Sequence, residues 1–62
     1  MELNLTPNLA DADGFYDTLL NAHEGKTKHE SDAYNARLIL ILCNHIGDRT
    51  TLDAALAAAQ KG

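Results

Sequence analysis

The chain has 62 residues and a formal net charge of −4 at pH 7. This length allows one domain, residues 1–62, and the five scattered lysines and arginines exclude the clustered basic surface of a nucleic-acid-binding protein. The same acidity disfavours binding to an anionic membrane surface. The longest apolar run has six residues, which is too short to span a membrane. The N-terminus lacks the basic and apolar regions of a signal peptide, so we expect a soluble cytoplasmic protein.

The small size makes the core of this protein marginal. A chain this short buries only about 60% of the surface that its unfolded form exposes. Such proteins usually need a disulfide, a metal, a partner or very good helix packing. Cys43 is the only cysteine, which excludes an internal disulfide. It lies in the apolar run Leu38–Cys43, where a free cysteine is typically a small buried hydrophobe, and a lone thiol suits a reducing cytosol.

Residues 1–10 hold the only proline, Pro7, and are predicted to form an N-terminal arm. Leu5 and Leu9 lie on either side of this proline. They either tuck over the helix ends, which makes the arm a strap, or they belong to an arm that reaches a partner as an added strand.

The first helix is predicted over about residues 11–24. Asp11 or Asp13 can cap its start, and Gly25 is a typical C-terminal cap. At about 100° per residue, one face of this helix is apolar and consists of Ala12, Phe15, Tyr16, Leu19, Ala22 and His23. We expect His23 to be a core or capping side chain on this face.

The second helix is predicted over residues 28–46. Thr27 and Glu30 have the spacing of a capping box at its start, and Gly47 ends it. The run Leu38–Cys43 alone is also compatible with a buried strand. The caps at both ends and the length of the segment favour a helix.

The third helix is predicted over about residues 49–60 and begins near residues 48–51. Thr50 and Asp53 resemble a weaker capping box at this start. Leu52 and Leu56 are the only large side chains on its apolar face. We therefore expect this helix to be a thin lid on the core.

The predicted helix 28–46 is apolar on nearly every face. One narrow polar stripe, Glu30, Arg37 and Asn44, recurs every seven residues. A surface helix needs an apolar stripe of only about 100°, and the neighbouring helices are expected to cover one side each. Large side chains remain without cover, and we predict that they form an interface with a second copy around a two-fold axis or with a larger protein: Leu38, Leu40, Ile41 and Leu42.

Polar residues on this helix are candidates for a specific role. Asn35 lies in the apolar face and either bonds a loop carbonyl or fixes the register of an interface. Arg37 either pairs with Glu30 or Asp48, or anchors a carboxylate of a partner. Asn44 and His45 complete the candidate set.

The sequence holds no catalytic constellation. A single cysteine and scattered hydroxyls do not make a nucleophile and base pair, and no glycine-rich phosphate loop is present, so we expect no enzyme activity and no cofactor. His23 and His45 lack the spacing of metal ligands, so we predict no metal site; a ligand or metal site across a dimer interface is the alternative. Three helices this small are expected to leave no pocket of a few hundred Å³ in one subunit.

Several motifs resemble those of the small bacterial domain-of-unknown-function family 2783. The resemblance covers nearly the whole chain and is carried by Asn8-Leu9-Ala10-Asp11, Gly14-Phe15-Tyr16, Ala22-His23-Glu24-Gly25, Asn35-Ala36-Arg37-Leu38-Ile39-Leu40 and Asn44-His45-Ile46-Gly47-Asp48. It implies a short cytoplasmic protein, often encoded beside flavin-dependent hydroxylases or other enzymes of aromatic catabolism. It therefore implies an accessory role, and it carries over no catalytic residue.

These observations predict an all-α fold that consists of a helical hairpin and a C-terminal helix. The domain is expected to dimerise through its central apolar helix. The expected function is that of a non-catalytic interaction protein, either a homodimer or an accessory subunit of a larger enzyme. The alternatives are an accessory component of a flavin-dependent aromatic hydroxylase, with Arg37, Asn44 and His45 as exposed candidates, and a small ligand-binding or metal-binding module.

Overall fold

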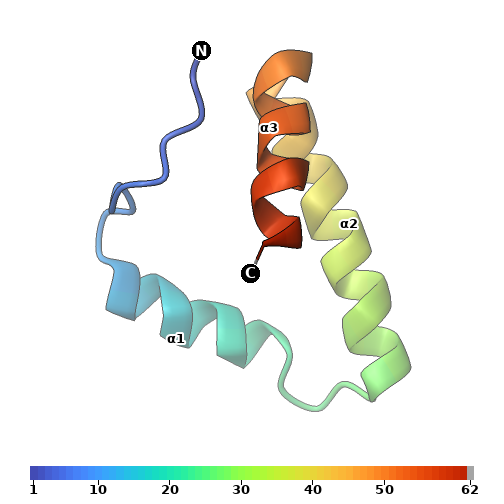
Figure 1. The fold of residues 1–62 in the computed structure, drawn as a ribbon. Helices are drawn as coiled ribbons and strands as arrows, with labels where there is room; N and C mark the ends of the chain where they lie inside the picture. The colour runs from blue at the N-terminus through green and yellow to red at the C-terminus, as the bar shows by residue number, and fades with distance from the viewer. Residues whose placement is uncertain (62) are drawn as a thin grey trace.

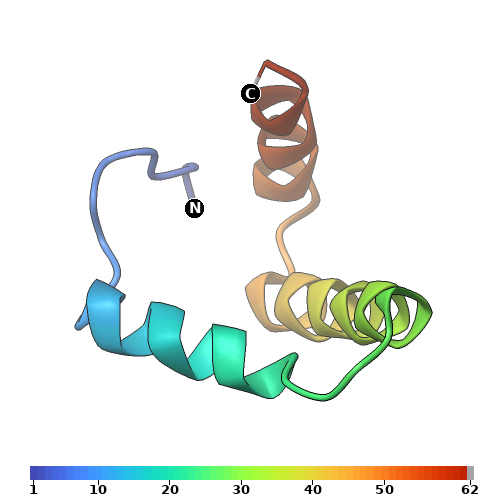
Figure 2. The same cartoon turned by 90° about the horizontal axis from the view of Figure 1, so that it is seen from below.

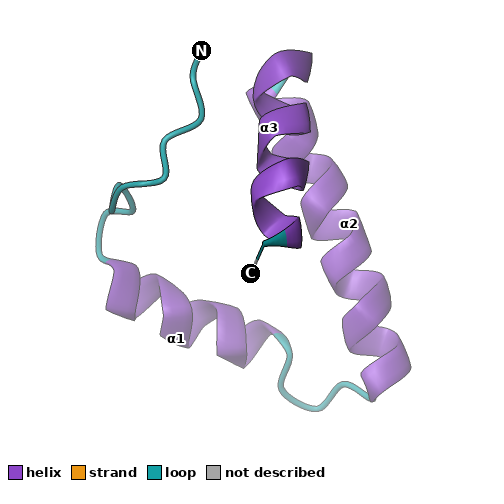
Figure 3. Cartoon of the chain, viewed as in Figure 1, coloured by secondary structure: helices purple, strands orange, loops and turns teal. Residues whose placement is uncertain are grey.

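The computed structural model describes residues 1–61 and contains three helices in that range, with no strand (Figures 1 and 3). They are α1 (Ala12–Ala22), α2 (Lys28–Ile46) and α3 (Arg49–Gln60). The predicted all-α class is confirmed. None of these helices is long and apolar enough to cross a membrane.

Asp11 caps the start of α1. Its backbone is left-handed, with φ of 50°, and its carboxylate accepts a hydrogen bond from the Gly14 N–H at 3.3 Å. The helix ends at Ala22, two residues before the predicted end. The reason is a tighter last turn, in which the N–H groups of His23 and Glu24 donate to carbonyls three residues back, at 3.1 Å each.

The ends of α2 follow from its own sequence. Thr27 and Glu30 form the predicted capping box, with the Glu30 N–H donating to Thr27 Oγ1 at 3.2 Å and the Thr27 N–H donating to Glu30 Oε1 at 2.8 Å. Gly47 adopts φ of 73° and donates its N–H to the Cys43 carbonyl at 2.9 Å. These caps define a helix of 19 residues.

The start of α3 differs from the prediction. Asp48 is the N-cap, because its carboxylate accepts the Thr51 N–H at 2.9 Å. The predicted capping box of Thr50 and Asp53 is wrong. Asp53 instead accepts a hydrogen bond from Arg49 Nε at 2.9 Å, as an ion pair one turn apart on the exposed side of the helix.

The arm and the three helices follow one another along an open, curved path, with the N-terminal arm across from α3 (Figures 1 and 2). Residues 23–27 connect the end of α1 to the start of α2. The helix α3 turns back from the end of α2 but stands away from it in the view of Figure 2. The radius of gyration is 13.3 Å. A compact domain of this length would have a radius of gyration of about 10.6 Å.

The arm closes this arrangement as a strap, but not through the predicted side chains. Thr51 Oγ1 lies 2.7 Å from the Met1 carbonyl oxygen, which brings the arm to the start of α3. Leu5 is 76% exposed and Leu9 is also exposed, so the prediction that they tuck over helix ends is wrong. Leu3 is half-buried in their place.

Residues 1–61 contain no buried apolar side chain, and Thr51, at 6% exposure, is the one residue buried in this range. The accessible surface is 5,499 Å². A folded monomer of this mass exposes about 3,900 Å². The prediction that α1 and α3 each cover one side of α2 is therefore wrong.

The reason lies in the two outer helices. α3 has only two large apolar side chains to offer, and the largest ones of α1 face solvent: Phe15, Tyr16 and Leu20. No pair of helices in the described part packs extensively.

Candidate interaction surface

The central apolar run of α2 faces solvent. Leu40 is 70% exposed, Ile41 is 65% exposed, and Ile39 and Leu42 are exposed to more than half. Leu38 is half-buried. Of the four predicted interface residues, Leu40, Ile41 and Leu42 therefore face solvent, and Leu38 does so only in part.

A groove of about 450 Å³ lies between α2 and α3. It is open to solvent, and its walls are mostly apolar, with Ile39 and Cys43 on α2 and Leu52, Ala55, Leu56 and Ala59 on α3. The ion pair of Arg49 and Asp53 lies at its edge. The expectation that one subunit has no space of a few hundred Å³ is wrong, because α3 stands away from α2.

A second, smaller hollow of about 160 Å³ lies on another face of α2 and is lined by Tyr34, Arg37, Leu38 and Ile41. Arg37 is exposed here and takes neither of the predicted carboxylate partners. Glu30 accepts from Thr27, and Asp48 accepts from the first turn of α3. The helix caps therefore use both carboxylates, and Arg37 remains an exposed residue that lines an apolar hollow.

The other polar candidates also lie in solvent. Asn35, Asn44 and His45 are exposed. Within residues 1–61 the Asn35 side chain makes no hydrogen bond, so the predicted bond to a loop carbonyl is wrong. An exposed amide between apolar residues is free to bond a partner.

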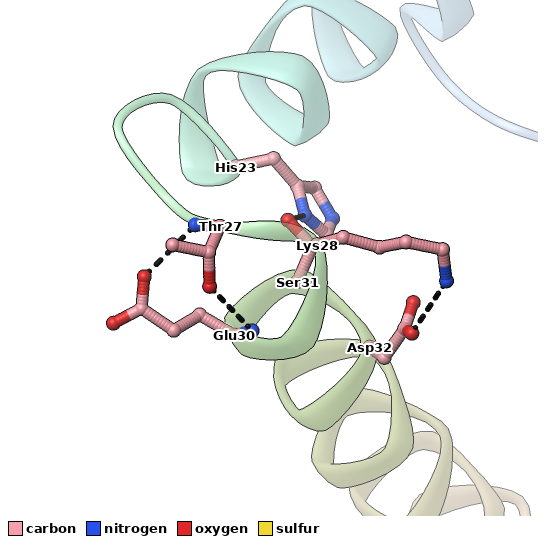
Figure 4. Close-up of polar contacts among 6 residues, drawn as sticks. All are labelled: His23, Thr27, Lys28, Glu30, Ser31 and Asp32. Atoms are coloured by element: carbon pink, nitrogen blue, oxygen red, sulfur yellow. Dashed lines mark hydrogen bonds and ion pairs between the residues drawn. The ribbon is translucent and has the colours of Figure 1, made fainter.

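A polar joint connects α1 to the start of α2 (Figure 4). His23, the C-cap of α1, shares a hydrogen bond of 3.0 Å between its Nδ1 and Ser31 Oγ. Its ring meets the Tyr34 ring edge-on at 5.1 Å, and Lys26 Nζ lies 4.9 Å from the centre of that ring. The predicted capping role of His23 is confirmed.

Ser31 and Tyr34, the partners of His23 in this joint, were not predicted from the sequence. They are three residues apart and thus share one face of α2, next to the loop that brings His23 back. This three-residue spacing is the sequence feature that could have predicted their contact with His23. His45 lies in the last turn of α2, roughly 20 Å along the axis from Ser31, so the two candidate histidines are not brought together in one chain.

Two cap carboxylates have lowered pKa values. The Thr27 N–H, and then the Thr27 hydroxyl, hold the pKa of Glu30 below its ordinary value. The Thr51 hydroxyl, and then the Thr51 N–H, lower the pKa of Asp48. Both groups are fixed by capping geometry, and no cluster of three or more histidine, cysteine or acidic side chains gathers within residues 1–61.

Comparison with known protein families gives one match. The family model described as "Protein of unknown function (DUF2783)" matches residues 3–61. This match spans nearly the whole chain, so the protein belongs to that family. Neither the curated proteins nor the solved structures yield a match.

Proposed function

We propose that this member of the DUF2783 family is a small interaction protein without catalytic activity of its own, which associates with another polypeptide through the apolar surface of α2. The observation that carries the proposal is the exposed area. The chain exposes 5,499 Å², roughly 1,600 Å² more than a folded monomer of its mass. An interface of that size on each partner belongs to obligate complexes rather than to transient contacts.

The lengths of the helices support the same proposal. α1 has 11 residues and α3 has 12. Isolated helices shorter than about 12–15 residues are marginal in water, and most helical stability in proteins comes from packing of an apolar face. Because intramolecular packing is slight here, a partner must supply that contribution.

The partner is either a second copy of this chain or a larger enzyme in the cytoplasm. Both would cover the same leucines. The exposed polar groups beside them, Asn35, Arg37, Asn44 and His45, are the candidates for partner selection. A partner carboxylate next to Arg37 would be the chemically simplest contact.

Sedimentation velocity on the purified chain, with Leu40→Glu and Ile41→Glu, tests this proposal. Each variant places a charge on the apolar face and should weaken association by about 30-fold or more, as loss of a 2 kcal/mol anchor would. His29→Glu is the control, because His29 is exposed in the polar first turn of α2. A stably folded monomer, with a melting temperature independent of concentration, would refute the proposal.

A further inference from the structure

The groove between α2 and α3 is a feature that the exposed leucines of α2 do not explain. We propose that a second copy of this chain fills it, with the α3 helices of the two copies packed against each other around a two-fold axis. This inference rests on the proposed function and names its partner. The groove of one copy then takes the Leu56 side chain of the other.

The chemistry of the groove selects an apolar occupant. Ile39 and Cys43 form one wall, and Leu52 and Leu56 are the large side chains of the other. The charged groups at the edge are Arg49 and Asp53, which already pair with each other at 2.9 Å. The groove therefore presents no unpaired charge to orient an anionic or cationic ligand.

The excess exposed surface of the chain is large enough to favour an occupant as large as the chain itself. A bound small molecule or a short peptide would fill the groove and leave the apolar surface of α1 and α2 in water. Two copies that each cover roughly 1,600 Å² form an interface of about 3,200 Å², within the range of obligate homodimers. An isologous dimer uses one self-complementary patch twice, so both copies lose exposed apolar surface in one step.

The α3 helix suits the position beside the two-fold axis. Leu56 is 68% exposed although it borders the groove, so its side chain is available to a second copy. Residues near a two-fold axis contact their own symmetry mates, which places Leu56 of each copy between the walls of the other groove. The rest of α3 is rich in alanine, which allows two helices to approach within about 8 Å.

Sedimentation equilibrium on the full chain, together with the reaction rate of Cys43 with a thiol reagent, tests the inference. Cys43 is the only thiol and lines the groove, so its reaction should slow as protein concentration rises. Leu56→Glu and Ile39→Glu should raise the dimer dissociation constant by about 30-fold or more and make the thiol fast-reacting. Leu56→Ala keeps the helix propensity of α3 and should show the same trend if the charged variants fail to fold.

Ala54→Glu is the matched control on the same helix. Ala54 is exposed and does not line the groove, so this variant should dimerise like wild type. A wild-type dimer that Leu56→Glu and Ile39→Glu leave intact would overturn the groove assignment, and Leu40→Glu would still test the proposed function. If the wild-type chain is a monomer at all concentrations, the inference that a second copy fills the groove is refuted. If that monomer gains helix only with another protein, the proposed function survives; if it is stably helical alone, both proposals fail.

Discussion

The hydroxyl of Thr51 lies 2.7 Å from the carbonyl oxygen of Met1, fifty residues away in the chain. The same hydroxyl contacts the carboxylate of Asp48, which caps α3. A threonine hydroxyl has one proton and can donate to only one of these two acceptors at a time. The side chain therefore couples the position of the arm to the cap of α3.

Replacement of Thr51 by valine should release the arm and leave α3 in place. Valine keeps the shape of the side chain, and the Thr51 N–H still donates to Asp48. We expect a loss of about 0.5–1.5 kcal/mol, the net contribution of one hydrogen bond. The NMR chemical shifts of residues 2–6 should move toward unstructured values, with little change in α3. Thr51→Ser keeps the hydroxyl and serves as the control; equal effects of the two variants would contradict the coupling.

The helix content should fall in acid because two caps depend on carboxylates. The pKa of Glu30 is below its ordinary value of 4.5, and that of Asp48 is below 3.8, in the folded state. A lowered folded pKa means that the carboxylate contributes stability above the unfolded pKa and that this contribution is lost as the pH falls through the folded pKa. Circular dichroism should therefore show loss of helix below about pH 4.

The matched variants separate the two caps. Glu30→Gln removes the titration at α2 while its amide oxygen can still accept from Thr27, so the acid transition should become shallower. Asp48→Asn does the same for α3. Glu2→Gln is the control, because Glu2 caps no helix of the described structure. An unchanged acid transition in both cap variants would exclude this explanation.

Gly14→Ala should not stabilise the chain, although alanine is the better helix former by about 1 kcal/mol. A Cβ at this position would overlap the Asp11 carboxylate, which accepts the Gly14 N–H. Gly14→Ala therefore displaces the Asp11 carboxylate, and the loss of this cap should offset the gain in helix propensity, so that the thermal stability of the chain does not rise. In an Asp11→Gly background, where no carboxylate is present, Gly14→Ala should instead raise the stability. Additive effects in this double-mutant cycle would contradict the clash.

The sequence was sufficient for features that depend on residues close together in the chain. The capping box of Thr27 and Glu30 spans four residues, and its geometry hardly depends on the rest of the fold. The cap of α3 was misassigned because Asp48 and Thr50 compete for the same helix start, and both residue types cap helices well.

The arrangement of the helices was not predictable in the same way. Periodicity shows that Ile39 and Leu52 are apolar-face residues, but it does not state how far apart their helices stand. The groove between them depends on the turn at Gly47 and Asp48 and on how little apolar surface α3 offers. The joint of His23 and Tyr34 depends likewise on the path of the loop between α1 and α2.

Added salt should strengthen the proposed dimer. Each copy has a formal net charge of −4, so two copies repel each other, and the screening length shrinks from about 10 Å at 0.1 M salt to about 3 Å at 1 M. We expect the dissociation constant to fall between low and high sodium chloride. A basic partner would give the opposite trend, because screening would weaken its attraction to this acidic chain.

A charge variant separates this repulsion from a general effect of salt on apolar contacts. Asp17 and Glu24 are exposed carboxylates outside the α2–α3 groove. The double variant Asp17→Asn, Glu24→Gln lowers the net charge to −2 per copy, by removal of two of the nine acidic groups. It should dimerise more tightly at low salt and respond less to added salt. If wild type and variant show the same salt dependence, repulsion between like-charged copies does not cause the effect of salt on the dissociation constant. The effect then comes from the burial of apolar surface alone.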